Sequence, residues 1–128
     1  MISYGFVKEV NAPFDQVLER LPGLLEKQGF GVISKIDLGQ KLREKLGIEF
    51  RKYVILGACN PPSAFKALTA EENIGLMLPC NVIVYEKEGR TTVATIRPSA
   101  MMKTIGNSAL TEIAEDIEEK LKRVIESI

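Results

Sequence analysis

The chain has 128 residues and a mass of 14.2 kDa, which suits one domain over residues 1–128. Its 17 Lys and Arg balance 17 Asp and Glu, so the sequence does not predict the basic surface that nucleic-acid binding requires. It has no histidine, so it has no imidazole for general-base catalysis or zinc binding. It shows no secretory leader and no apolar stretch near the roughly 20 residues that cross a bilayer. We therefore expect a cytoplasmic protein with reduced thiols and no nucleic-acid or membrane partner.

The N-terminal quarter predicts a strand followed by a helix. Alternating apolar residues indicate a strand over residues 2–10. Apolar residues at spacings of three and four then predict a helix capped by Asn11. Pro22 cannot donate to the carbonyl four residues before it, so we expect a kink or a short break there, and Gly29 ends the helix.

The next segments predict two strands separated by a short helix. Residues 30–37 alternate again, and residues 48–59 are rich in β-branched and aromatic side chains. Between them, residues 38–46 predict a short charged helix that Asp37 caps and Gly47 closes.

The C-terminal half predicts a helix, a hairpin and a long final helix. A short helix is expected over about residues 63–72, and residues 81–87 and 90–97 predict a hairpin around the turn Glu88-Gly89. The final helix, capped by Asn107 or Ser108, follows from a run of apolar residues at helical spacing: Leu110, Ile113, Ala114, Ile117, Leu121, Val124, Ile125 and Ile128. Its other face predicts three i,i+4 ion pairs: Asp116–Lys120, Glu118–Lys122 and Glu119–Arg123. The order of elements predicts an α+β fold with a mostly antiparallel sheet and helices packed on one face.

Two stretches at strand boundaries combine a thiol with Asn and Pro: Cys59-Asn60-Pro61 and Pro79-Cys80-Asn81. Cys59 ends the third predicted strand, and Cys80 begins the fourth. If these strands are antiparallel neighbours, both thiols lie at the same edge of the sheet. If the strands are parallel, the thiols are separated by about a strand length.

The residues around Cys59 predict a site for an anionic ligand. A residue before proline is kept out of the helical backbone region, which suits Asn60 as the cap of a helix that begins near Pro61. The free N–H groups of that helix would then lie near the Cys59 thiol, lower its pKa and attract an anion. Arg97, at the end of the last predicted strand, is the expected counter-charge at the same edge.

Simpler interpretations of the same residues stay open. Free cysteines often behave as small buried hydrophobic residues, and Asn and Pro are ordinary turn residues. The two cysteines lack the C-x-x-C spacing of a dithiol redox motif, and they fall short of the four ligands usual for structural zinc, so no metal is predicted. Met77, Met101 and Met102 are expected to fill gaps in the core.

Four segments together resemble the bacterial and archaeal family called domain of unknown function 302: Gly29-Phe30-Gly31-Val32, Ile36-Asp37-Leu38, Cys59-Asn60-Pro61 and Leu78-Pro79-Cys80-Asn81-Val82. The resemblance covers nearly the whole chain and implies a TATA-box-binding-protein-like fold of order β-α-β(4)-α, in which the segments 39–46 and 63–72 are additions. It carries over no catalytic residue, and the shared fold class implies no DNA binding. Its motif positions are candidate ligand contacts: Cys59, Asn60, Pro61, Pro79 and Cys80.

These observations predict a small-ligand-binding domain whose thiol-containing site is formed by Cys59, Asn60, Pro61, Pro79, Cys80 and Arg97. The sequence identifies neither the ligand nor a cofactor. One alternative is a non-catalytic homodimerisation module, which an exposed sheet face or strand edge would favour. Another is a thiol-dependent redox enzyme, which requires a thiol pKa well below the free value of about 8.5.

Overall fold

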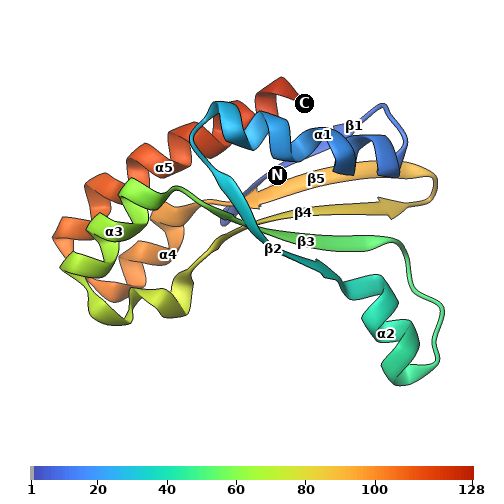
Figure 1. The fold of residues 1–128 in the computed structure, drawn as a ribbon, viewed down its shortest axis with the longest axis horizontal. Helices are drawn as coiled ribbons and strands as arrows, with labels where there is room; N and C mark the ends of the chain where they lie inside the picture. Colours follow the sequence, from blue (N-terminus) through green and yellow to red (C-terminus); the bar gives the residue numbers. More distant parts are fainter. Residues whose placement is uncertain (1) are drawn as a thin grey trace.

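The computed structural model describes residues 2–128, and its central feature is one five-stranded antiparallel sheet (Figure 1). In the order in which they hydrogen-bond, the strands are β1 (Gly5–Val10), β5 (Arg90–Ile96), β4 (Cys80–Lys87), β3 (Tyr53–Cys59) and β2 (Gly31–Asp37). Every neighbouring pair is antiparallel. The predicted α+β class and antiparallel sheet are therefore confirmed.

The remaining elements are helices that lie around this sheet. They are α1 (Phe14–Lys27), α2 (Leu38–Leu46), α3 (Pro61–Ala70), the 3-10 helix η1 (Glu72–Met77), α4 (Pro98–Ile105) and α5 (Ser108–Ser127). Figure 1 shows α1 and α5 over one face of the sheet, and α3, η1 and α4 gathered at one end. α2 projects on the side away from α1 and α5, whereas the two helices that cover the sheet, α1 and α5, lie on one face as expected (Figure 1). With α2, α3, η1 and α4 set aside, the order is compatible with β-α-β(4)-α. No helix within residues 2–128 has the length and apolar content to cross a membrane.

The main core lies between the sheet and the apolar stripes of α1 and α5. Leu21 and Leu25 of α1 and Leu121 of α5 are completely buried against alternate strand residues such as Val84 and Val93. Burying one such side chain contributes about 1.5–3 kcal/mol. A second, smaller cluster around Ile74 and Leu110 joins α3, η1, α4 and α5 at the end of the sheet.

Helix α1 is unbroken although Pro22 lies within it. The expected break at Pro22 is therefore absent, because the buried stripe of α1 outweighs the one hydrogen bond that proline removes. The helix begins after Pro13, which makes no side-chain cap, so Asn11 as the cap is a wrong prediction. Gly29 follows the helix with φ +84°, as expected of a residue that ends a helix.

The other predicted ends and turns are mostly confirmed. The Asp37 side chain accepts a hydrogen bond from the backbone of Gln40 and so caps α2, which ends at Gly47 with φ +65°. The hairpin turn lies at Glu88-Gly89, and the third strand begins only at Tyr53. Neither η1 nor α4 was expected, because neither segment carries a long periodic pattern.

Helix α5 matches its prediction except for one ion pair. Asn107 caps it by accepting a hydrogen bond from the Ala109 N–H. The pairs Lys120–Asp116 and Arg123–Glu119 form at 3.1 Å and 4.0 Å. Glu118 does not pair with Lys122, because its carboxylate is taken by Arg97 at 3.4 Å, far away in the sequence.

Candidate functional site

A cavity of about 320 Å³ lies where the ends of β3 and β4 meet α3, η1, α4 and α5. Its wall includes Phe30 and Ala58 from the sheet side, Ala67 from α3, Met102 from α4, and Leu110 and Ala114 from α5. No charged side chain is among the described residues that line it. The cavity exists because alanines occupy helix positions where larger residues would fill the space.

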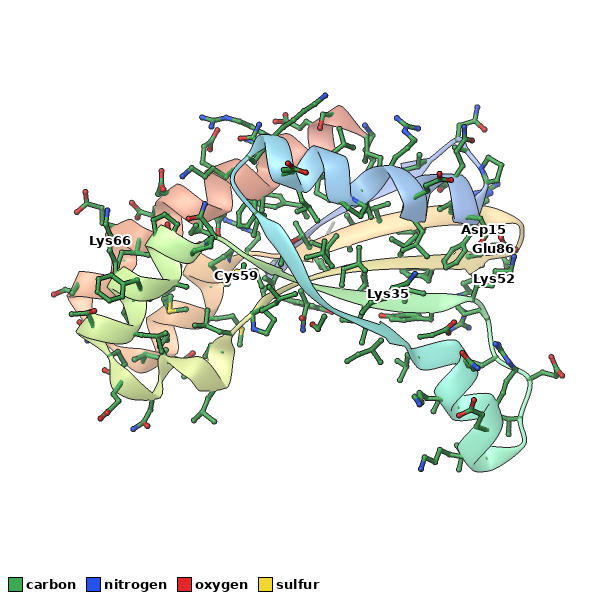
Figure 2. The ribbon with its side chains drawn as sticks, in the orientation of Figure 1. Asp15, Lys35, Lys52, Cys59, Lys66 and Glu86 are labelled. Atoms are coloured by element: carbon green, nitrogen blue, oxygen red, sulfur yellow. The ribbon has the colours of Figure 1, made fainter. Side chains whose placement is uncertain are left out.

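The register of the sheet brings the two cysteines to this cavity. β3 and β4 are antiparallel neighbours, and Ala58 lies directly opposite Cys80. Cys59 follows Ala58 and lies opposite Gly31 on β2. Figure 2 shows Cys59 where the sheet ends and α3 begins. The prediction that both cysteines lie at one edge of the sheet is therefore confirmed, and both are free thiols that line the cavity.

Cys80 is not an activated thiol. Burial raises its pKa from 9.0 to about 11, and the nearby Cys59 adds to the shift because two thiolates would repel each other. A redox or nucleophilic thiol needs the opposite shift. Cys80 is therefore a neutral, weakly polar group in this wall.

Asn60 is the best-placed polar side chain of the cavity. It is only 9% exposed, and its Oδ1 accepts the Ser63 N–H at 3.3 Å, which caps α3. Among the described residues, its Nδ2 has no hydrogen-bond acceptor. This amide nitrogen would lie only 3.0 Å from a Cβ at Gly29, so the close packing of Asn60 and the φ of +84° both favour glycine there. The Asn60 side chain thus offers one unused donor to a ligand.

The start of α3 does not offer the free N–H groups that the sequence suggested. Pro61 and Pro62 have no N–H, the Ser63 N–H donates to Asn60 Oδ1, and the Ala64 N–H donates to the Asn60 carbonyl at 2.9 Å. The interpretation of this helix end as an anion site is therefore wrong. Pro61, which belongs to the motif, and the adjacent Pro62 remove the donors that an anion would need.

Arg97 lies at the expected end of the sheet, but it is not part of the cavity wall. Its Nη2 pairs with Glu118, and its guanidinium carbon lies 5.4 Å from the centre of the Phe6 ring. Pro61 is exposed and does not line the cavity either. The structure thus brings together four of the six candidate residues: Cys59, Asn60, Pro79 and Cys80.

Pro79 closes the cavity from the β4 side. Its ring lies against Gly57 on β3, so close that a Cβ at position 57 would come within 2.7 Å of Pro79 Cγ. Only glycine at position 57 allows this close approach.

The sequence analysis missed the helical walls of the cavity. Pro98 and Met102 belong to α4, which was not expected, and Ala64 and Ala67 belong to α3. The only feature of the sequence that could have indicated these walls was the presence of alanines on apolar helix faces. All the sulfur-containing residues from 2 to 128 line either this cavity or the adjoining one of about 210 Å³: Cys59, Met77, Cys80, Met101 and Met102. No group of three His, Cys, Asp or Glu side chains within residues 2–128 is arranged to hold a metal ion.

The Cys80 thiol is expected to react slowly with iodoacetamide in the folded protein. A pKa of about 11 instead of 9.0 lowers the thiolate fraction near pH 8 by roughly 100-fold. Because the pKa of Cys80 is higher in the folded state, the neutral thiol contributes to the free energy of unfolding. This contribution is fully present below the pKa of the unfolded state, and it is lost as the pH rises toward 11. Mass spectrometry of a Cys59→Ser variant, labelled over a pH series, measures the rate. A labelling midpoint near pH 9 in the native protein, equal to that in guanidinium, would contradict a buried Cys80.

Comparison with known proteins gives one family. The family model described as "Domain of unknown function DUF302" matches residues 6–128. A crystal structure of an uncharacterized conserved protein DUF302 from Bacillus stearothermophilus is similar, with 32% sequence identity, a TM-score of 0.91 and 98% of each chain covered. No curated protein matches the chain significantly.

Proposed function

The chain belongs to the DUF302 family, and from its own geometry we propose that it binds a small, uncharged and largely apolar molecule in the cavity beside Cys59 and Cys80. The observation that carries the proposal is an apolar cavity whose wall includes Asn60, a side chain with one amide donor that is unused within residues 2–128. Its volume of about 320 Å³ lies within the range of small-molecule sites.

The lining determines the chemistry of the ligand. Carbon and sulfur atoms form nearly all of the wall, so an apolar or aromatic molecule would replace water at little cost. An anion would lose its hydration without gaining a cation, since Arg97 is engaged by Glu118 and the start of α3 lacks free donors. The proposed ligand is therefore neutral rather than anionic.

Asn60 supplies the polar contact that would orient the ligand. Its Nδ2 can donate to a carbonyl or ether oxygen, while its Oδ1 stays bound to the Ser63 N–H. Because this donor has no acceptor within residues 2–128, a ligand with an acceptor gains a hydrogen bond that a plain hydrocarbon does not. The free state of both thiols is consistent with a reducing compartment such as the cytoplasm.

Binding is tested with N-phenyl-1-naphthylamine, an uncharged fluorophore whose emission rises in apolar sites. Titration is expected to give a dissociation constant on the order of micromolar. Ala64→Phe places a ring in the cavity and is expected to abolish binding, whereas Ala70→Phe, exposed on the same helix, is the matched control. Ala114→Leu fills the cavity from α5 and repeats the test if Ala64→Phe does not fold.

Competition then tests the polarity of the site. 1-Acetylnaphthalene, a neutral acceptor, is expected to displace the probe at least about tenfold better than 1-naphthoate. Asn60→Ser keeps a capping oxygen and removes the amide donor, so it is expected to reduce the advantage of 1-acetylnaphthalene over naphthalene. Equal binding by wild type and Ala64→Phe, or preference for the carboxylate, would overturn the proposal.

A further inference from the structure

One face of the sheet carries a complete apolar row that no helix of residues 2–128 covers. Strand residues such as Val54, Val82 and Val93 point toward α1 and α5, so the residues that alternate with them point the other way. On this open face, directly paired residues form a row across all five strands: Ile36, Ile55, Ile83, Ala94 and Val7. A sheet face left to water normally carries polar residues at such positions.

The open face is both exposed and hollow. Ile36 and Val7, at the two ends of the row, are 45% and 43% exposed. Next to the row, the rings of Tyr53 and Tyr85 stack with their centres 5.4 Å apart. A hollow of about 520 Å³ lies over this surface, lined by apolar residues such as Ile83 and Ala94 and also by Arg51 and Lys87. This surface could therefore receive a convex apolar partner.

Helix α2 is charged overall but carries one apolar stripe, and it projects from the same side of the sheet (Figure 1). Its Leu38, Leu42 and Leu46 lie four residues apart and share one stripe. Gly39 anchors its first turn, packed so closely that a Cβ there would lie 2.6 Å from the Arg51 carbonyl oxygen. The far end is uncovered: Leu46 is 64% exposed, and nearby Ile48 is 44% exposed.

The area of the open face suits a second copy of the chain as the partner. Five strands about 4.8 Å apart, and rows about 7 Å apart, give a face of roughly 20 by 20 Å. Its middle row is apolar, and its flanking rows add Tyr53, Tyr85 and Ile96 beside polar residues such as Asn81 and Thr92. Two such faces with two α2 helices bury about 1,000 Å² or more, which is enough for a specific interface. The net charge of zero means that two copies do not repel each other at long range.

We propose that two copies of this chain associate through their open faces, with α2 of each copy lying against the sheet of the other. A two-fold pairing uses the same surface on both copies, so each copy supplies one hollow and one helix. This develops the homodimerisation alternative from the sequence, and it does not depend on the ligand cavity, which lies between α3, α4 and α5.

Light scattering after size exclusion tests the proposal on the full chain. At roughly 100 μM, wild type is expected to have about twice the mass of 14.2 kDa. Val7→Lys and Ile36→Lys place a charge in the apolar interface and are expected to give monomers with an unchanged circular dichroism spectrum. Phe65→Lys, which is 74% exposed on α3 and is not among the residues that line the hollow, is the matched control and is expected to remain dimeric.

A second variant tests the role of α2. Leu46→Lys changes the exposed end of the stripe, so it is expected to raise the dimer dissociation constant at least about tenfold. A monomeric wild type, or a dimer that survives Val7→Lys and Ile36→Lys, would overturn the whole proposal. A dimer lost with Val7→Lys but unchanged by Leu46→Lys would overturn the part assigned to α2.

Discussion

Leu121→Ala is expected to lower the free energy of unfolding by about 2–5 kcal/mol. Leu121 is completely buried on α5, in the main core between α1 and the sheet. The truncation removes apolar contacts and leaves a cavity that rigid neighbouring elements cannot close. Urea unfolding followed by circular dichroism measures the change as a lower midpoint with an unchanged slope.

Leu76→Ala provides the control for this measurement. Leu76 is a leucine of the same size but 89% exposed on η1, so its truncation is expected to change stability by less than about 0.5 kcal/mol. Similar losses for the two variants would show that α5 does not pack on the sheet as described.

Glu118→Ala is expected to cost about 2–3 kcal/mol and to loosen helix α4. The residue at the N-cap position of α4, Arg97, makes no side-chain cap. Its cap comes instead from α5, because the Glu118 carboxylate accepts the Ser99 N–H at 3.1 Å and the Ser99 hydroxyl at 2.6 Å, and also pairs with Arg97 at 3.4 Å. Without that carboxylate, Arg97 loses its counter-charge while its Nε is already buried without a partner. Because α4 supplies Met102 to the cavity, probe binding is expected to weaken as well.

Hydrogen exchange of the α4 amides measures the local loosening, and urea unfolding measures the total cost. Glu118→Gln keeps an acceptor for Ser99 and loses the charge, so it is expected to recover part of the loss. Glu119→Ala is the control, since its partner Arg123 is 4.0 Å away and both side chains are more than half exposed. Equal effects at positions 118 and 119 would rule out a capping role for Glu118.

The candidate site was predictable only where it depends on strand pairing. The thiols of Cys59 and Cys80 could be placed together because both lie at strand ends and the connections favour antiparallel neighbours. The same reasoning placed Arg97 at the correct end of the sheet. It could not show that the Arg97 guanidinium turns toward Glu118, because the position of α5 decides which carboxylate a long side chain can reach.

The polarity of the site was mispredicted for a local reason. The Asn60-Pro61-Pro62 step does form the predicted helix start, and Asn60 does cap it. Two consecutive prolines, however, leave no free N–H for an anion. This consequence was readable from the residues, whereas the apolar wall opposite was not, because it is built by α4 and α5.

By itself, the sequence determined the elements that rest on local periodicity and turn chemistry: the strands, the hairpin turn at Glu88-Gly89, and the helices α1, α2 and α5. These follow from interactions between residues close in the chain. Only the tertiary structure decided that a cavity remains beside the cysteines, that Glu118 caps α4, and that the row from Ile36 to Val7 faces outward with no helix of residues 2–128 over it. Each of these depends on how elements distant in sequence dock, since their packing decides which apolar and charged groups are buried, paired or left exposed.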